Sequence, residues 1–261
     1  MKRLNLLPLT AALLLCAGAA RAQFARTEDL RVRPPEAWQP HELYGLSLNA
    51  GGSYLNGNVK NYSFTGGLEF DWKPAAAHSL YLQAADSYVK YGDAAVTDKS
   101  KGSLLYAYAA RPQWNLFLQT THSHDKFRSV KYRMTNTAGV CHHNFLPGAF
   151  RPVMVSAGIT PEYEKDNAGV IKRDLRATAR VNFLMPLTDT VKLSGDFLYA
   201  PRLADTGDAR VYSEGFLEFK VWKDAVAFRV TATEEYDTRP APGVKRNDFG
   251  LAHSLVIKFA R

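Results

Sequence analysis

The sequence predicts an all-β protein, a transmembrane antiparallel up-and-down β-barrel of about twelve strands. Strand-like alternation of apolar and polar residues recurs from residue 42 to the end of the chain. Short and long connections alternate between these segments along the chain. The chain also opens with a segment typical of secretion, and no later run approaches the about 18 apolar residues of a spanning helix.

The opening segment has the three parts of a cleaved signal peptide. Lys2 and Arg3 form a charged start, residues 4–15 are largely apolar, and residues 20–22 read Ala-Arg-Ala, a small-x-small cleavage site. The apolar part is shorter than the about 20 residues that a membrane anchor needs. We expect a signal peptide over 1–22, a polar, proline-containing periplasmic lead-in over 23–41, and an outer-membrane barrel over 42–261.

Charge and cysteine content exclude some classes of protein. Cleavage removes the three charges of Lys2, Arg3 and Arg21, so the formal net charge falls from +8 to +5. No block of Lys and Arg suggests a nucleic-acid partner. Cys141 is the one cysteine that remains after cleavage, so no disulfide within the chain is expected.

The clearest alternation lies in residues 61–73, NYSFTGGLEFDWK, where Tyr62, Phe64 and Trp72 share one face and Glu69 and Asp71 the other. A period of two is typical of a strand with one apolar and one polar face. A charged side chain facing lipid at mid-membrane costs about 2–4 kcal/mol. The apolar face is therefore expected to contact lipid and the polar face to point into the barrel.

The sequence does not assign the two faces of strand 79–91. Asp86 lies on the same face as Leu80 and Leu82, so the face with these leucines is not free of charge. The other predicted strands are 43–55, 102–111, 114–124, 132–144, 152–164, 173–186, 190–200, 210–222, 225–236 and 248–259.

Connections after the second, fourth, eighth and tenth strands are short, whereas 92–101, 164–172 and 237–247 are predicted as longer charged loops. Short turns at one end and loops at the other are typical of outer-membrane barrels. Aromatic residues near strand ends are expected to form the interfacial girdles: Tyr44, Tyr54, Trp72, Trp114, Tyr199, Tyr236 and Phe259.

Several stretches resemble domain-of-unknown-function family 481 (DUF481), which includes salt-induced outer membrane proteins. They are LNGNVKNYSF near the start of the barrel, HDKFRSVKYRMTNTAGV at 124–140, GITPEYEKD at 158–166, and the final EEYDTRPAPGVKRNDFGLAHSLVIKF. The resemblance implies a membrane barrel with no established catalytic residues. Outer-membrane chains usually end on an aromatic residue that the barrel-assembly machinery reads during insertion. Here Ala260 and Arg261 follow Phe259, so that signal is displaced.

We do not expect an enzyme, a catalytic residue, a cofactor or a metal site. A lipid hydrolase needs a serine beside a histidine base. Neighbouring residues of a strand point to opposite faces, so His122 and Ser123, or His253 and Ser254, form no such pair, and the spacing His-x-Ser is absent. The run 141–143, Cys-His-His, matches no zinc spacing.

A channel remains open as a hypothesis, with these candidate lumen-lining residues: Glu69, Asp71, Arg176, Arg180, Asp196, Glu214, Glu218 and Arg229. They predict no strong preference for ions of either sign. An occluded barrel and a narrow pore are equally compatible, since twelve strands fall between filled and open barrels. We expect an outer-membrane protein in contact with lipid and lipopolysaccharide, serving envelope or salt-stress adaptation with narrow passive permeability. A substrate-specific small pore is the alternative, and a lipid hydrolase a distant one.

Overall fold

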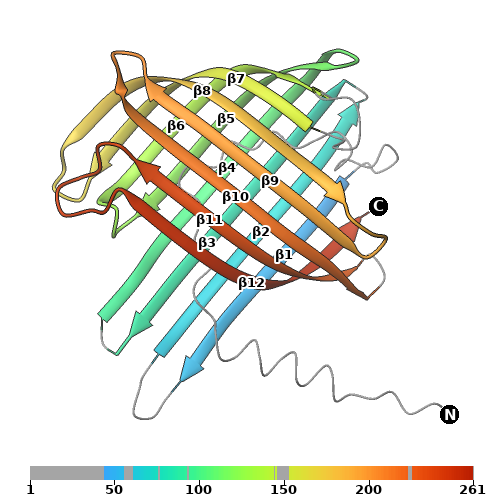
Figure 1. Ribbon diagram of the computed structural model, residues 1–261, viewed down its shortest axis with the longest axis horizontal. Coiled ribbons are helices and arrows are strands. Elements are labelled where there is room, and N and C mark those ends of the chain that lie inside the picture. The colour runs from blue at the N-terminus through green and yellow to red at the C-terminus, as the bar shows by residue number, and fades with distance from the viewer. Residues whose placement is uncertain are drawn as a thin grey trace.

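The computed structural model describes residues 44–55, 61–75, 77–92, 94–143, 145, 153–222 and 225–260, and these form a β-barrel (Figure 1). The strands are β1 (Tyr44–Leu55), β2 (Asn61–Ala75), β3 (His78–Tyr91), β4 (Ala94–Arg111), β5 (Trp114–Asp125), β6 (Val130–His142), β7 (Val153–Asp166), β8 (Ile171–Pro186), β9 (Val191–Arg202), β10 (Asp205–Trp222), β11 (Val226–Asp237) and β12 (Asn247–Ala260). Within the described residues, nothing forms a helix long and apolar enough to cross a membrane.

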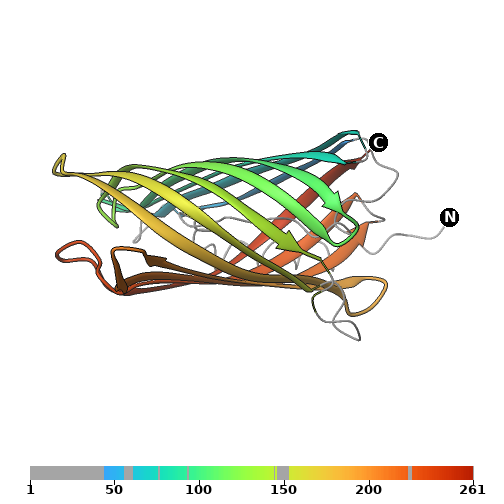
Figure 2. The same cartoon turned by 90° about the horizontal axis from the view of Figure 1, so that it is seen from above.

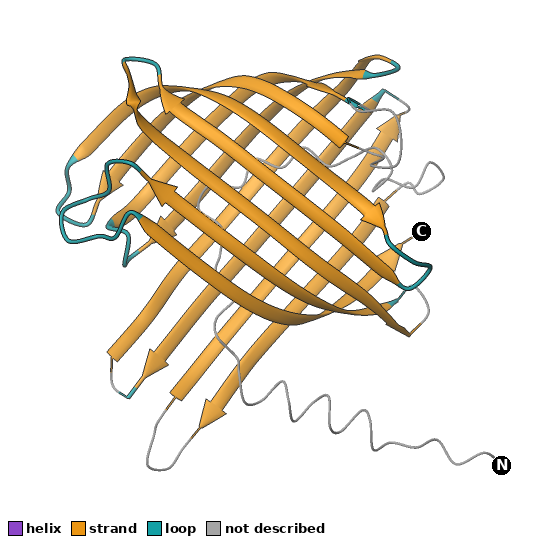
Figure 3. Cartoon of the chain, in the orientation of Figure 1, coloured by secondary structure: helices purple, strands orange, loops and turns teal. Residues whose placement is uncertain are grey.

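Each strand pairs antiparallel with its neighbours in the chain, and β1 pairs with β12 to close the barrel. In this closing pair Gly45 lies opposite Ala260 and Ala50 opposite Leu255. Figure 3 shows strands throughout the wall, with the described loops and turns at the two ends of the barrel. The all-β, twelve-stranded, up-and-down barrel predicted from the sequence is confirmed.

The outer face of the barrel is apolar. On β2 the side chains of Tyr62 and Phe64 are 48% and 45% exposed, whereas those of Ser63 and Thr65 are 3% and 6% exposed. On β8, Leu175 and Val181 are exposed in the same way, and the arginines between them are buried. An apolar exterior over a polar interior is the reverse of a soluble barrel and suits a lipid environment.

Strand β3, whose faces the sequence left unassigned, follows the same rule. Tyr81 is buried inside the barrel at 1% exposure, and Leu82 is 41% exposed outside it. Asp86 therefore lies on the outer face with Leu82, and it is exposed there.

Aromatic side chains are exposed near the strand ends, as predicted for Tyr44, Trp72, Trp114, Tyr199 and Tyr236. The side chains of Tyr54 and Phe259 lie outside the described part of the structure. Exposed aromatic residues at both ends of an apolar band are typical of the two membrane interfaces.

Two strands begin several residues earlier than the sequence predicted. Residues 92–101 are not a charged loop, because β4 starts at Ala94 and its Thr97 and Lys99 are buried inside the barrel. Likewise β10 starts at Asp205 rather than at residue 210. In β4 polar residues point into a polar interior, so alternation of polarity could not reveal the start of this strand. In β10 the pairing with β9 is irregular between Asp205 and Ala209, which interrupts the alternation. We call the end with the β3–β4, β5–β6, β7–β8, β9–β10 and β11–β12 connections the loop end, and the other the turn end.

Part of the interior is apolar. A cluster of buried side chains on β3 to β7 consists of Tyr81, Leu105, Ala107, Phe117, Cys141 and Met154. These side chains take up part of the space inside the barrel next to β3 to β7.

Position 139, on the inner face, has no room for a side chain, which explains the glycine there. A Cβ at this position would lie 2.4 Å from the carbonyl oxygen of Ala157 and 2.6 Å from Cζ of Phe117. We expect Gly139→Ala to lower the free energy of unfolding by about 1–3 kcal/mol, because a backbone atom has to shift. Urea unfolding of the refolded barrel in lipid vesicles measures the effect.

Gly102 provides the matched control, because a Cβ there would meet no heavy atom within 4 Å. Gly102→Ala is expected to leave the unfolding midpoint near the wild-type value. Equal midpoints for the two variants would contradict the close approach at Gly139.

Candidate functional site

The inner face carries the eight charged residues that the sequence proposed for a lumen. Seven are between 2% and 7% exposed: Glu69, Arg176, Arg180, Asp196, Glu214, Glu218 and Arg229. The eighth, Asp71, lies on the same face of β2, its Oδ2 3.6 Å from where a Cβ on Gly45 would sit. A permeation path along them stays a prediction, and their contacts show how the interior is filled.

Arg180 and Asp196 form an ion pair between the neighbouring strands β8 and β9. Nε of Arg180 donates to Oδ1 of Asp196 at 2.6 Å, and Nη2 donates to the second carboxylate oxygen. Two parallel hydrogen bonds are the strongest geometry of an arginine with a carboxylate. The pair links β8 to β9 on the inner face of the barrel.

Arg229 on β11 contacts two carboxylates, one from the strands on each side of β11 in the ring. Its Nη2 lies 2.8 Å from Oε2 of Glu218 on β10, and its Nη1 lies 4.0 Å from Oε1 of Glu69 on β2. The guanidinium also stacks 4.4 Å above the ring of Phe216. The structure thus brings together three of the predicted residues, whereas Glu214 accepts a hydrogen bond from Tyr212 at 2.8 Å.

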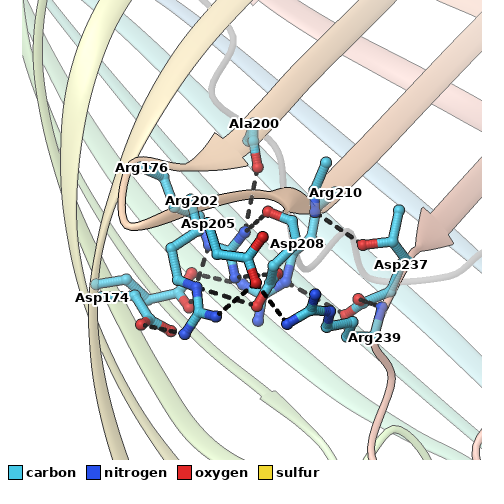
Figure 4. Close-up of polar contacts among 12 residues, drawn as sticks. Asp174, Arg176, Ala200, Arg202, Asp205, Asp208, Arg210, Asp237 and Arg239 are labelled. Atoms are coloured by element: carbon cyan, nitrogen blue, oxygen red, sulfur yellow. Dashed lines mark hydrogen bonds and ion pairs between the residues drawn. The ribbon is translucent and has the colours of Figure 1, made fainter.

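Arg210 is the centre of a larger network near the loop end (Figure 4). Its Nη1 is 2.5 Å from Oε2 of Glu162, its Nη2 is 3.0 Å from Oε2 of Glu164, and its Nε is 3.4 Å from Oδ2 of Asp237. Arg133 adds a second cation to Glu164 at 2.6 Å. Arg210 on β10 thereby ties β7 to β11.

Arg176 and Arg202 extend this network toward solvent. Arg176 lies 3.7 Å from Glu162 and 3.1 Å from Asp208. Arg202 lies 3.3 Å from Asp208 and 3.4 Å from Asp174. We call the whole set the loop-end network: Arg133, Glu162, Glu164, Asp174, Arg176, Arg202, Asp208, Arg210 and Asp237.

Two further ion pairs cross the barrel. Arg128, in the turn between β5 and β6, pairs with Glu235 on β11, which lies on the far side of the ring of strands. Lys99 on β4 lies 3.1 Å from Asp125 on β5 and 3.5 Å from Asp248 on β12. Figure 2 shows the blue-to-green strands facing the orange strands across the barrel. The contacts of Arg128 with Glu235 and of Lys99 with Asp248 join segments that are not neighbours in the ring.

The turn that carries Arg128 is built by local hydrogen bonds. Oδ1 of Asp125 accepts from the backbone N–H groups of Phe127 and Arg128, both at 3.0 Å. Ser129 closes the turn with a φ of 60°. This fixed backbone aims the Arg128 side chain over the mouth of the barrel.

The sequence did not identify Arg210, Glu162, Glu164, Arg128 or Lys99 as members of the site. Glu162 and Glu164 flank Tyr163 on a predicted strand, so their inward position was available from the sequence. Lys99 was hidden in a segment predicted as a loop. The contact of Arg128 with Glu235 depends on the closed ring, and no pattern along one strand reveals it.

The Cys-His-His run at 141–143 does not converge. Cys141 is buried inside the barrel, and among the described residues no group of three histidine, cysteine or acidic side chains could hold a metal ion. Burial, aided by the neighbouring His142, lowers the pKa of His143 to about 4. His143 is therefore neutral at neutral pH.

Comparison with known proteins gives one family and several solved structures. The DUF481 family, described as proteins of unknown function, matches residues 48–259. No curated protein matches the chain.

The similar structures include the NanC porin, with 8% identity, a TM-score of 0.47, and coverage of 82% of this chain and 97% of the porin. The translocator domain of the autotransporter NalP from Neisseria meningitidis has 12% identity, a TM-score of 0.46, and coverage of 83% and 86%. A FadL homologue from Pseudomonas aeruginosa has 9% identity, a TM-score of 0.35, and coverage of 82% and 73%. With TM-scores below 0.5, these likenesses carry no conclusion about what the chain does.

Proposed function

The chain belongs to the DUF481 family of proteins of unknown function, and from its barrel we propose an outer-membrane protein whose ion-paired interior limits passage to small ions. The role that we propose is adaptation of the envelope to salt. The pairing of Arg128 with Glu235 across the mouth is the observation that carries this proposal.

The exposed apolar band and its aromatic borders support a place in the outer membrane. In this proposal residues 1–22 are a cleaved signal peptide, residues 23–41 are a periplasmic lead-in, and the turn end faces the periplasm. The outer band then contacts lipid and lipopolysaccharide, and the barrel-assembly machinery inserts the chain.

The degree of burial supports narrow passage. Arg176 and Arg180, at 3% and 2% exposure, are held in ion pairs that salt screens weakly. Arg239 and Asp205, at the rim of the loop end, pair at 2.6 Å but are partly exposed, at 55% and 37%, so external salt screens them more. Rising salt therefore weakens the ion pairs at the rim more than the ion pairs in the interior.

A liposome swelling assay tests the proposal. We expect liposomes that contain the refolded barrel to swell in isosmotic arabinose or glucose no faster than protein-free liposomes. An open porin refolded in the same way is the positive control. Rapid swelling in both sugars would contradict restricted passage, and rapid swelling in a single class of solute would favour a substrate-specific pore instead.

A further inference from the structure

Polar side chains interrupt the apolar outer wall on β3, β4 and β5 near the loop end. We call them the outer polar patch: Asp86, Asp98, Ser100, His122 and His124. They face outward because they alternate with buried inward residues, namely Ser87, Lys99, Lys101, Ser123 and Asp125. Ionisable groups that face lipid cost free energy and commonly mark a functional site.

The register of the sheet places three members of the patch in one row. Asp86 is opposite Ser100 on β4, and Ser100 is opposite His124 on β5. The Cβ atoms of such directly opposed residues are about 4.5–5.5 Å apart. A side-chain rotation therefore brings the hydroxyl of Ser100 within hydrogen-bond reach of the His124 imidazole.

A backbone contact sets the tautomer of His124 that a general base needs. Its Nδ1 lies 3.0 Å from the carbonyl oxygen of Lys131, and a carbonyl only accepts, so Nδ1 donates a proton there. In the neutral ring the lone pair is then on Nε2, which is the atom that a serine nucleophile needs. Oδ1 of Asp98 lies 3.8 Å from Nε2 and stabilises the ring once it is protonated.

There is room for a substrate beside Ser100. Gly102 follows on the same outer face, between Ala84 on β3 and His122 on β5, and a Cβ there would meet no heavy atom within 4 Å. His122 itself is held by the hydroxyl of Tyr132 at 2.7 Å.

Aromatic pairs flank the patch on both sides. Tyr62 and Tyr88 lie 6.3 Å apart between ring centroids, and Tyr132 and Tyr163 lie 6.2 Å apart. Tyrosines at strand ends lie at the level of lipid headgroups. The patch is therefore at the depth where the ester bonds of membrane lipids lie.

We propose that Ser100 and His124 form a serine hydrolase site for an acyl ester of a lipid in the membrane that surrounds the barrel. Oγ of Ser100 attacks the ester carbonyl while Nε2 of His124 takes its proton. The C–O bond to the alcohol breaks, and the alcohol leaves with that proton. Water then attacks the acyl-serine and gives a proton to Nε2. The fatty acid departs, and the proton returns to Ser100.

This proposal departs from the expectation that the chain is not an enzyme. That expectation rested on pairs of serine and histidine within one strand. Ser100 and His124 instead lie opposite each other on two neighbouring strands. The site is on the outer wall, so it is independent of the passage through the interior.

Covalent labelling by a fluorophosphonate probe tests the proposal on the full-length mature barrel refolded in lipid. We expect the wild type to be labelled at Ser100, as located by mass spectrometry. Labelling is expected to be lost in Ser100→Ala and to slow about 100-fold or more in His124→Gln. Vesicles of phosphatidylethanolamine should release free fatty acid with wild type and not with Ser100→Ala.

Ser123→Ala is the matched control, because Ser123 adjoins His124 in sequence but points into the barrel. It is expected to be labelled like the wild type, and heat-modifiable migration on gels shows that each variant is folded. An unlabelled wild-type barrel that is folded, or labelling that persists in Ser100→Ala, would overturn the proposal.

Discussion

Replacing Arg210 with Met is expected to lower the free energy of unfolding by about 3–5 kcal/mol, since removal of one partner leaves buried charges uncompensated. Arg210 is the cation that Glu162, Glu164 and Asp237 share on the inner face. Its loss leaves three carboxylates near one another with fewer cations between them. Urea unfolding of the refolded barrel in lipid vesicles gives the size of the effect.

Arg173→Met is the control for this substitution. Arg173 is on β8 near the same end of the barrel, but its side chain is exposed. A surface change of this kind is expected to stay within about 0.5 kcal/mol of the wild type. If Arg210→Met and Arg173→Met unfold at the same urea concentration, the loop-end network does not hold the walls together.

Reversing the charge of Arg128 is expected to open the mouth of the barrel. In Arg128→Glu, two carboxylates face each other where Arg128 and Glu235 now pair across the ring. Like charges repel at this distance, so the β5–β6 turn should move off the mouth and the ion conductance should rise. The measurement is single-channel recording in a planar bilayer.

A charge swap distinguishes repulsion between the two carboxylates from a general disruption of the fold as the cause of a higher conductance. The double variant Arg128→Glu with Glu235→Arg restores a pair of opposite charges and is expected to return conductance toward the wild-type value. Lys126→Glu makes the same change of charge in the same turn at an exposed position and is expected to change conductance little. A double variant that conducts as much as Arg128→Glu would refute the pairing across the mouth.

The fold could be predicted because a barrel imposes one local rule on every strand. Alternation on residues 61–73 and 173–186 indicated which side chains face outward, and the structure confirms this for Tyr62, Phe64 and Leu175. The rule fails where the inward residues and their neighbours are both polar, as in Asp98, Lys99 and Ser100. There the start of β4 resembled a loop.

The sites could be predicted only in part, because they depend on register and closure. Inward charges such as Arg180 and Arg229 were identified from alternation alone. Their partners come from other strands, and the pairing of Ser100 with His124 is set by the register between β4 and β5. A sequence pattern along one strand does not contain that register.

How far the interior restricts the passage of ions is decided by the conductance of the wild-type barrel in a planar bilayer with symmetric KCl, after heat-modifiable migration has shown that it is folded. Ion pairs that cross the interior predict conductance steps that are absent or far smaller than those of an open porin in the same solution. Large, discrete and reproducible steps from the folded wild type, of the size of an open porin's, would contradict a restricted interior.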